Sequence, residues 1–359
     1  MSVSKVHQSH HLTIFVAFLV SFVMLLNGNG LAQQMRDAPR FSEKTIILEN
    51  GIVGRGVQFE SANPPSFAAV ITGKPEFPKI KIDGQLFMPK DKKPGKIPVV
   101  ILAPGSLSVG KNLLDHANSL TSIGMAVLVF EPFGGRGISD TVADQSKLSW
   151  AASSYDVLAA VKFLANLPDI NPEKIGAQGH SRGGTAVLLA AMSQMSQAVL
   201  DRDISLAAVL AAYPWCGNQF AIPKLGRTEL RILMGDRDNW VSPIQCQACV
   251  QALVARDEKA SMRLYPGAYH SFDRANEPPK EFPEAITALN LPIIYMNDEG
   301  ILIDYRTEKA DPNLADGDIL KYAFTQGLIK RGAVMGTQAN QAEEFKKDML
   351  SFFSTRLNP

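Results

Sequence analysis

The chain has 359 residues, of which 46% are hydrophobic and 20% are charged. This composition excludes a disordered, coiled-coil or collagen-like chain and fits one large globular domain or two smaller ones. Lys and Arg number 36 against 35 for Asp and Glu, so the chain lacks the strong positive field used by proteins that bind nucleic acid or anionic membranes. Its three cysteines are too few for a disulfide scaffold or an all-cysteine zinc site.

The N-terminal segment is typical of a secretory signal peptide. An apolar stretch from Leu12 to Leu26 follows Lys5 and is too short to cross a bilayer, which takes about 20 residues. Small residues at Gly30 and Ala32 predict cleavage after Ala32, with export to the periplasm or the medium and no membrane attachment afterwards. The alternative is that the segment stays as an N-terminal anchor.

The mature chain begins with short alternating segments. Residues 80–82 alternate apolar and polar side chains, and Asp83-Gly84, a common turn dipeptide, separates them from a second short segment at 85–88. We therefore expect antiparallel strands and a hairpin in the region before residue 98.

From Pro98 onward, continuous apolar runs alternate with helical patterns, which indicates a mostly parallel sheet flanked by helices. The expected strands are residues 99–103, 125–130, 174–177, 206–212, 231–234 and 262–265. The expected helices are residues 112–123, 155–167, 183–195 and 243–255, with a final amphipathic helix at 340–353 that should close the sheet. Residues 280–335 have little periodicity, and we expect an irregular insertion packed near the functional site within a single domain spanning 33–359.

The chemistry begins at Gly179-His-Ser181-Arg-Gly183, a G-x-S-x-G motif between a predicted strand and a predicted helix. In that context the motif is a nucleophile elbow, in which a sharp turn exposes the serine hydroxyl above the sheet. The alternative is a glycine-rich turn that only packs a helix against a strand.

A nucleophilic serine needs a histidine base and an acid, in the order Ser, Asp or Glu, His along this kind of chain. His270 is the one histidine after Ser181, and it follows the last predicted parallel strand. The acid should follow the preceding strand, where Asp236 and Asp238 compete, and the turn after Gly235 favours Asp238. We assign packing or surface roles to His116 and His180.

The negative oxygen formed during acyl transfer needs backbone N–H donors. One is expected from Arg182, directly after the nucleophile, and another from Ser106 or Leu107, in the loop after the 99–103 strand.

Several of these segments resemble the dienelactone hydrolase family of the α/β-hydrolase fold, particularly secreted members with a serine nucleophile. The resemblance is carried by residues 103–106, 130–137, 179–184, 213–216, 235–241 and 265–273. It implies catalytic roles for Ser181, Asp238 and His270, and favours Asp238 over Asp236. Two positions depart from the family pattern, because Ser181 stands where the namesake enzymes have cysteine and Pro104-Gly105 replaces the usual His-Gly. Both departures favour general ester hydrolysis over a specific lactone substrate.

Substrate-binding candidates are less specific. Trp215 and Trp240 each follow a strand near the proposed acid and could line an apolar pocket. Arg136, Arg182 and Arg274 could bind a substrate carboxylate, although each could equally form a structural ion pair.

The cysteines support one structural prediction and one rival function. Export into an oxidising compartment and the adjacency of two strands predict a Cys216–Cys246 disulfide that leaves Cys249 free and buried. The alternatives are a Cys216–Cys249 disulfide and three reduced, buried cysteines. The rival function is a thiol-disulfide oxidoreductase using the C-x-x-C of Cys246 and Cys249. A third hypothesis, a non-catalytic binding protein with this fold, would need a damaged triad.

The sequence thus predicts a serine hydrolase that acts on a small-molecule carboxylic ester or lactone. We expect no metal or organic cofactor and no nucleic-acid partner, and the oligomeric state stays open.

Overall fold

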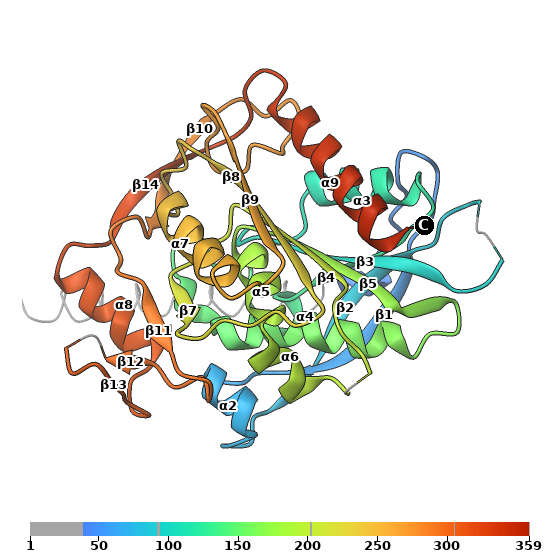
Figure 1. The fold of residues 1–359 in the computed structure, drawn as a ribbon. Helices are drawn as coiled ribbons and strands as arrows, with labels where there is room; N and C mark the ends of the chain where they lie inside the picture. Colours follow the sequence, from blue (N-terminus) through green and yellow to red (C-terminus); the bar gives the residue numbers. More distant parts are fainter. Residues whose placement is uncertain (1–38, 92–93, 202, 305, 359) are drawn as a thin grey trace, which may run out of the picture. The chain divides into compact units, whose positions relative to one another are not determined.

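An eight-stranded sheet forms the centre of the fold, with strand order β1-β2-β4-β3-β5-β6-β8-β9 (Figure 1). The β1–β2 and β2–β4 pairs are antiparallel, and the pairs from β4 to β9 are parallel. The strands are β1 Arg55–Ala62, β2 Lys79–Phe87, β3 Ile97–Ala103, β4 Ala126–Glu131, β5 Ile170–His180, β6 Ala208–Ala212, β8 Glu229–Gly235 and β9 Ala260–Tyr265. The six predicted parallel strands are confirmed.

The structure is a computed structural model that describes residues 39–91, 94–201, 203–304 and 306–358. The predicted signal segment, residues 1–32, lies outside the described residues. Phe41–Pro359 form one compact unit. No helix in the described ranges combines the length and apolarity needed to cross a lipid bilayer.

The predicted hairpin at Asp83-Gly84 is wrong, because both residues lie inside β2. A Cβ on Gly84 would come within 3.0 Å of Leu128 and 3.2 Å of Val57, so glycine permits close packing between strands at this point. The buried Asp83 carboxylate accepts hydrogen bonds from Ser42 and Gln58, each at 2.8 Å. The dipeptide therefore serves strand packing and not a turn.

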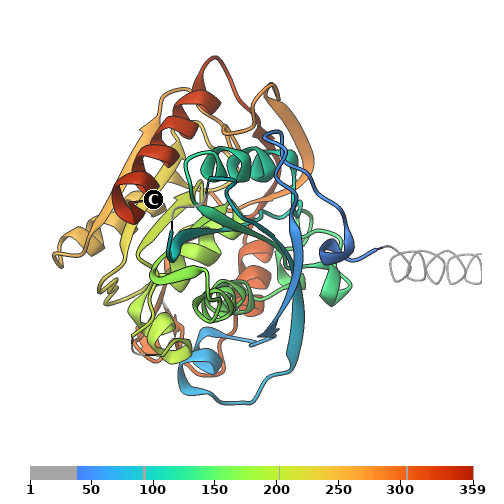
Figure 2. The same ribbon diagram turned by 90° about the vertical axis from the view of Figure 1, so that its right-hand side faces the viewer.

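Helices cover both faces of the sheet. α3 and α9 pack against each other over one face, while α4, α5 and α6 pack together over the other (Figure 1). The view in Figure 2 shows the red C-terminal helix α9 beside the teal α3. The helices are α2 Phe67–Thr72, α3 Lys111–Thr121, α4 Trp150–Ala165, α5 Arg182–Ala190, α6 Ser193–Val199, α7 Pro243–Val254, α8 Asp316–Thr325 and α9 Gln341–Leu357, with short 3-10 turns η1 Phe41–Glu43, η2 Gly134–Arg136 and η3 Gln145–Lys147.

The single helix expected at 183–195 is two helices. Met192 has extended backbone angles, and the N–H of Ser193 donates to the carbonyl of Lys224 at 2.7 Å. This bond to a distant segment takes the donor away from the helix and starts α6 in a new direction.

Residues 280–335 are more regular than expected. β10 Lys280–Thr287 pairs with β14 Lys330–Met335, and β11 Ile294–Met296 pairs in parallel with β7 Asn218–Phe220. A two-residue pair, β12 Ile303–Asp304 and β13 Lys309–Ala310, precedes α8. The strands were missed because their partners lie far away in sequence and the β10–β14 register is irregular between Phe282 and Ile286.

Candidate active site

Ser181 lies on the sharp turn between β5 and α5. Its backbone has φ 53° and ψ −115°, a region that L-residues rarely occupy. Two glycines make the turn sterically possible. A Cβ added to Gly179 would lie 2.0 Å from the carbonyl oxygen of Gly183, and a Cβ added to Gly183 would lie 2.2 Å from the carbonyl oxygen of Ala103. The turn presents the serine side chain at the carboxyl edge of the sheet.

The three predicted triad residues form one chain of hydrogen bonds. Ser181 Oγ lies 2.8 Å from His270 Nε2, and His270 Nδ1 lies 2.7 Å from Asp238 Oδ2. The His270 and Asp238 side chains are 2% and 0% exposed, so water competes little for these bonds. The arrangement can move a proton from the serine hydroxyl to the histidine and hold the resulting imidazolium next to a carboxylate.

The structure separates the two candidate acids clearly. Asp238 turns inward, and its Oδ1 accepts the backbone N–H groups of Trp240 at 2.9 Å and Val241 at 3.0 Å, leaving Oδ2 for the histidine. Asp236 is exposed and accepts the N–H of Gly267 at 2.7 Å, which makes it a turn cap.

The segments that carry the proposed oxyanion donors both lie next to Ser181. Arg182 is the first residue of α5, where a helix leaves its N–H without an intrahelical partner. Ser106 and Leu107 form the tip of a tight turn closed by the Ser108 N–H and the Gly105 carbonyl at 3.0 Å. A Cβ on Gly105 would lie 3.3 Å from the Ser181 Cβ, so the turn sits directly beside the serine.

Glu131, at the end of β4, fixes this turn and was not identified from the sequence. Its carboxylate accepts Ser108 Oγ at 2.8 Å and the N–H groups of Phe133 at 3.0 Å and Gly134 at 2.6 Å. Ser108 has φ 64°, so this bond holds an unfavourable backbone conformation in place. The sequence feature that could have identified Glu131 is its place at the end of β4, the strand next to β3.

Aromatic rings pack against the His270 imidazole, and a buried carboxylate anchors the loop that carries it. The ring centroid of Tyr213 lies 4.7 Å and that of Trp240 4.9 Å from His270. Tyr213 donates its hydroxyl to Asp273 Oδ1 at 2.6 Å, and Asn112 donates to Asp273 Oδ2 at 2.9 Å. Asp273 thus ties the loop that carries His270 to two other elements, a role we did not predict.

His116, His180 and Asp273 are the ligand-type side chains of the described residues that lie close enough together to hold a metal ion, with candidate ligand atoms within 4.8 Å of one another. All three are buried, so a surface role for His116 or His180 is wrong. Gln178 Nε2 lies 2.9 Å from His116 Nδ1 and 3.1 Å from His180 Nε2. Burial lowers the pKa of His116, and it lowers the pKa of His180 to about 3. The two histidines are therefore neutral, and they lie beside the Asp273 carboxylate in a buried polar layer beneath the site.

The segment 280–335 is joined to the loops that carry the acid and the base. The Ala288 N–H donates to the Trp240 carbonyl at 2.9 Å, and the Val334 N–H donates to Asn239 Oδ1 at 2.8 Å. The Gly336 N–H, directly after β14, donates to the His270 carbonyl at 2.8 Å. These bonds hold the two loops in a fixed relation.

Two cavities open at Ser181. The histidine-side cavity, about 370 Å³, is lined by Ser181 and His270 together with Gly105, Ser106, Leu107, Ser108, Asn112, Leu113, His180, Tyr213, Trp240, Ser271, Arg274 and Met335. The tryptophan-side cavity, about 500 Å³, is lined by Ser181 and Arg182 together with Ser106, Gln145, Trp150, Trp215, Trp240, Val241, Ile286, Thr287, Ala288, Leu291, Leu320 and Ile329. The two predicted tryptophans thus both lie at the site.

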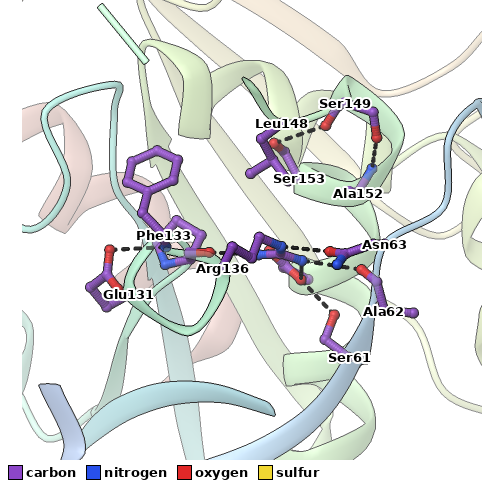
Figure 3. Close-up of polar contacts among 12 residues, drawn as sticks. Ser61, Ala62, Asn63, Glu131, Phe133, Arg136, Leu148, Ser149, Ala152 and Ser153 are labelled. Atoms are coloured by element: carbon purple, nitrogen blue, oxygen red, sulfur yellow. Dashed lines mark hydrogen bonds and ion pairs between the residues drawn. The ribbon is translucent and has the colours of Figure 1, made fainter. Parts of the chain in front are cut away.

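The prediction that Arg136 binds substrate is wrong. Its five N–H groups are matched by acceptors on Asn63, Pro132, Ala62 and both oxygens of Asp156, at 2.6–3.1 Å. Figure 3 shows the guanidinium reaching Asn63 and Ala62 beside Ser61. The Arg136 and Asp156 side chains are 4% and 0% exposed, so the pair joins β1, η2 and α4 and has no donor left for a ligand.

The other two arginines do line the cavities. Arg182 stacks over the Trp150 ring at 4.3 Å and donates to Gln145 and to the Leu148 carbonyl. Burial lowers the pKa of Arg182 to about 9, which leaves the guanidinium charged at neutral pH. Arg274 pairs with Glu277 at 3.3 Å at the edge of the histidine-side cavity.

A disulfide joins Cys216 and Cys246, with a Cα–Cα distance of 5.0 Å, and Cys249 is free and buried. Burial raises the pKa of Cys249 to about 12, so its thiolate is strongly disfavoured. Because Cys246 bonds Cys216 and not Cys249, the oxidoreductase hypothesis is contradicted. The hypothesis of a binding protein with a damaged triad also finds no support in the intact hydrogen-bond chain.

The chain is similar to several solved protein structures. A putative dienelactone hydrolase from Klebsiella pneumoniae has a similar fold, with 17% identity over 83% of this chain and 98% of that chain and a TM-score of 0.49. Est1E from Butyrivibrio proteoclasticus has 20% identity over 53% of this chain and 86% of that chain and a TM-score of 0.40. No curated protein matches the sequence.

The family model of the dienelactone hydrolase family matches residues 82–296, more than half of the chain. The matched range includes the elbow, the acid loop, the base loop and the disulfide. The chain belongs to the dienelactone hydrolase family and is a hydrolase of the ester or lactone type.

Proposed function

We propose that this protein is a serine esterase that forms an acyl-enzyme on Ser181. The observation that carries the proposal is the continuous hydrogen-bond chain from Ser181 Oγ through His270 to Asp238, at 2.8 and 2.7 Å. A serine beside a buried histidine–carboxylate pair is the standard arrangement for nucleophilic attack on a carbonyl carbon.

The mechanism has two half-reactions. His270 Nε2 accepts the proton of Ser181 as Oγ attacks the carbonyl carbon, and it then returns the proton to the departing alcohol. Water repeats the sequence on the acyl-enzyme and releases the acid. Asp238 keeps the Nδ1 proton in place and stabilises the imidazolium, while the N–H of Arg182 and one from Ser106 or Leu107 receive the negative charge of the tetrahedral intermediate.

A fluorophosphonate probe and p-nitrophenyl esters test the proposal. The wild type should be labelled at Ser181 alone and should hydrolyse the esters. The Ser181→Ala and His270→Ala variants should each lose on the order of 10³-fold or more in kcat, and the double variant should lose little beyond that. A Ser181→Ala protein that keeps near wild-type turnover after removal of contaminating esterases would refute the proposal.

We also propose that the protein is exported and loses residues 1–32. The apolar stretch ending at Leu26 and the small residues Gly30 and Ala32 support this. N-terminal sequencing of protein isolated from cell fractions should find Gln33 as the first residue. Full-length protein retained in a membrane fraction would show an anchor instead.

A further inference from the structure

We propose that the tryptophan-side cavity binds the acyl group of the substrate and the histidine-side cavity binds its alcohol, which makes the enzyme selective for esters of bulky apolar acids, aromatic acids above all. This assignment rests on the proposed triad. Each cavity is assigned to one half of the ester, according to the catalytic groups that this half must reach during the reaction.

The position of His270 determines which cavity holds the alcohol. During acylation a bond forms between Ser181 Oγ and the carbonyl carbon, and the hydroxyl proton moves to His270 Nε2. The bond between that carbon and the alcohol oxygen then breaks, and the alcohol leaves with the proton from Nε2. The alcohol oxygen must therefore lie within hydrogen-bond reach of Nε2. Among the described residues, His270 lines the histidine-side cavity and not the tryptophan-side cavity.

The positions of the oxyanion donors determine which cavity holds the acyl group. The carbonyl carbon carries the carbonyl oxygen, the alcohol oxygen and the acyl chain. When the carbonyl oxygen lies between the N–H of Arg182 and the turn at Ser106, the acyl chain points away from the alcohol. Ser106 lines both cavities, as expected for a group at the carbonyl oxygen, whereas Arg182 lines the tryptophan-side cavity. The acyl group therefore enters the tryptophan-side cavity.

The walls of that cavity select apolar acids. Most of its lining side chains are apolar, and they include three tryptophans: Trp150, Trp215 and Trp240. The one guanidinium in the wall already stacks on Trp150 and donates to Gln145 and Leu148. A charged acyl group would therefore lose its hydration and could gain at most two unpaired N–H donors, Arg182 Nε and Trp215 Nε1. The flat ring faces of the three tryptophans suit an aromatic acyl group better than a thin aliphatic chain.

The helix α8 of the 280–335 segment offers a matched pair of positions to test this. Leu320 lies on the wall of the tryptophan-side cavity and is half-buried. Phe324, one turn further along the same helix, is 61% exposed and outside the cavity lining. The Leu320→Trp variant narrows the cavity, whereas Phe324→Trp places the same indole in solvent, outside the cavity lining.

The experiment measures kcat/KM for two ester series, one with a fixed alcohol and acyl groups from acetyl to benzoyl, the other with a fixed acid and alcohols of increasing size. The wild type should prefer benzoyl to acetyl esters. Leu320→Trp should lower the benzoyl-to-acetyl ratio by about tenfold or more, while the alcohol ranking stays unchanged. Phe324→Trp should leave both rankings unchanged, and Leu107→Trp, in the histidine-side cavity, should change the alcohol ranking.

The outcomes separate this inference from the proposed function. If hydrolysis depends on Ser181 but Leu320→Trp changes the alcohol ranking, or neither ranking, the cavity assignment is overturned and the esterase stands. A wild type that prefers acetyl to benzoyl esters also overturns it. If hydrolysis does not depend on Ser181, both proposals fall together.

Discussion

Replacing Asp238 with asparagine should nearly abolish activity while leaving the shape of the site intact. In the native protein Asp238 Oδ1 accepts two backbone N–H groups, at 2.9 and 3.0 Å, and Oδ2 faces His270 Nδ1 at 2.7 Å. The amide introduced by Asp238→Asn must keep its oxygen toward the two N–H donors, so its NH₂ group faces Nδ1. Nδ1 must then accept, the proton moves to Nε2, and Nε2 can no longer take the proton of Ser181.

The expected loss is on the order of 10⁴-fold in kcat, or about 5 kcal/mol of transition-state stabilisation. The matched control is Asp236→Asn, where the amide oxygen can still accept the Gly267 N–H in an exposed turn, and kcat should stay within about twofold. Steady-state assays with a p-nitrophenyl ester, on protein whose urea-unfolding midpoint is checked, give both values. A stable Asp238→Asn enzyme within about tenfold of the wild type, or a larger loss in Asp236→Asn, would show that the acid has been misassigned.

The buried polar groups and the cysteines allow three further tests. Arg136→Met should lower the free energy of unfolding by about 3–5 kcal/mol in urea titrations, because it leaves the Asp156 carboxylate buried without its partner; equal stability would contradict this. Denatured, unreduced protein should yield one alkylatable thiol, Cys249, and reduced protein three; three thiols without reductant would exclude the disulfide. Burial alone would raise the pKa of Asp273, but hydrogen bonds from Asn112 and Tyr213 lower it. The carboxylate therefore stabilises the fold above about pH 4, and this contribution falls as the pH drops through the lowered pKa. Asp273→Asn should therefore be destabilised at pH 7 and show a shallower loss of stability in acid; an unchanged pH dependence would refute this.

The sequence by itself determined the parallel strands, most of the helices and the three residues of the hydrogen-bond chain. These features depend on residues close together in the chain: apolar runs, helical periodicity, and the glycines that flank Ser181. The order Ser181, Asp238, His270 was also predictable, because each residue follows a strand, and the carboxyl ends of parallel strands meet at one edge of the sheet.

The tertiary structure alone decided which polar side chain meets which partner. Arg136 was a candidate for binding substrate until the fold brought Asp156 and Asn63 around it, and Asp83-Gly84 was a turn signal until strands on both sides packed against it. The β10–β14 pair and the cavities beside Ser181 likewise join residues from distant segments. Local preferences amount to fractions of a kcal/mol per residue, whereas burying a charge or closing a sheet involves several, so the long-range contacts decide wherever the two disagree.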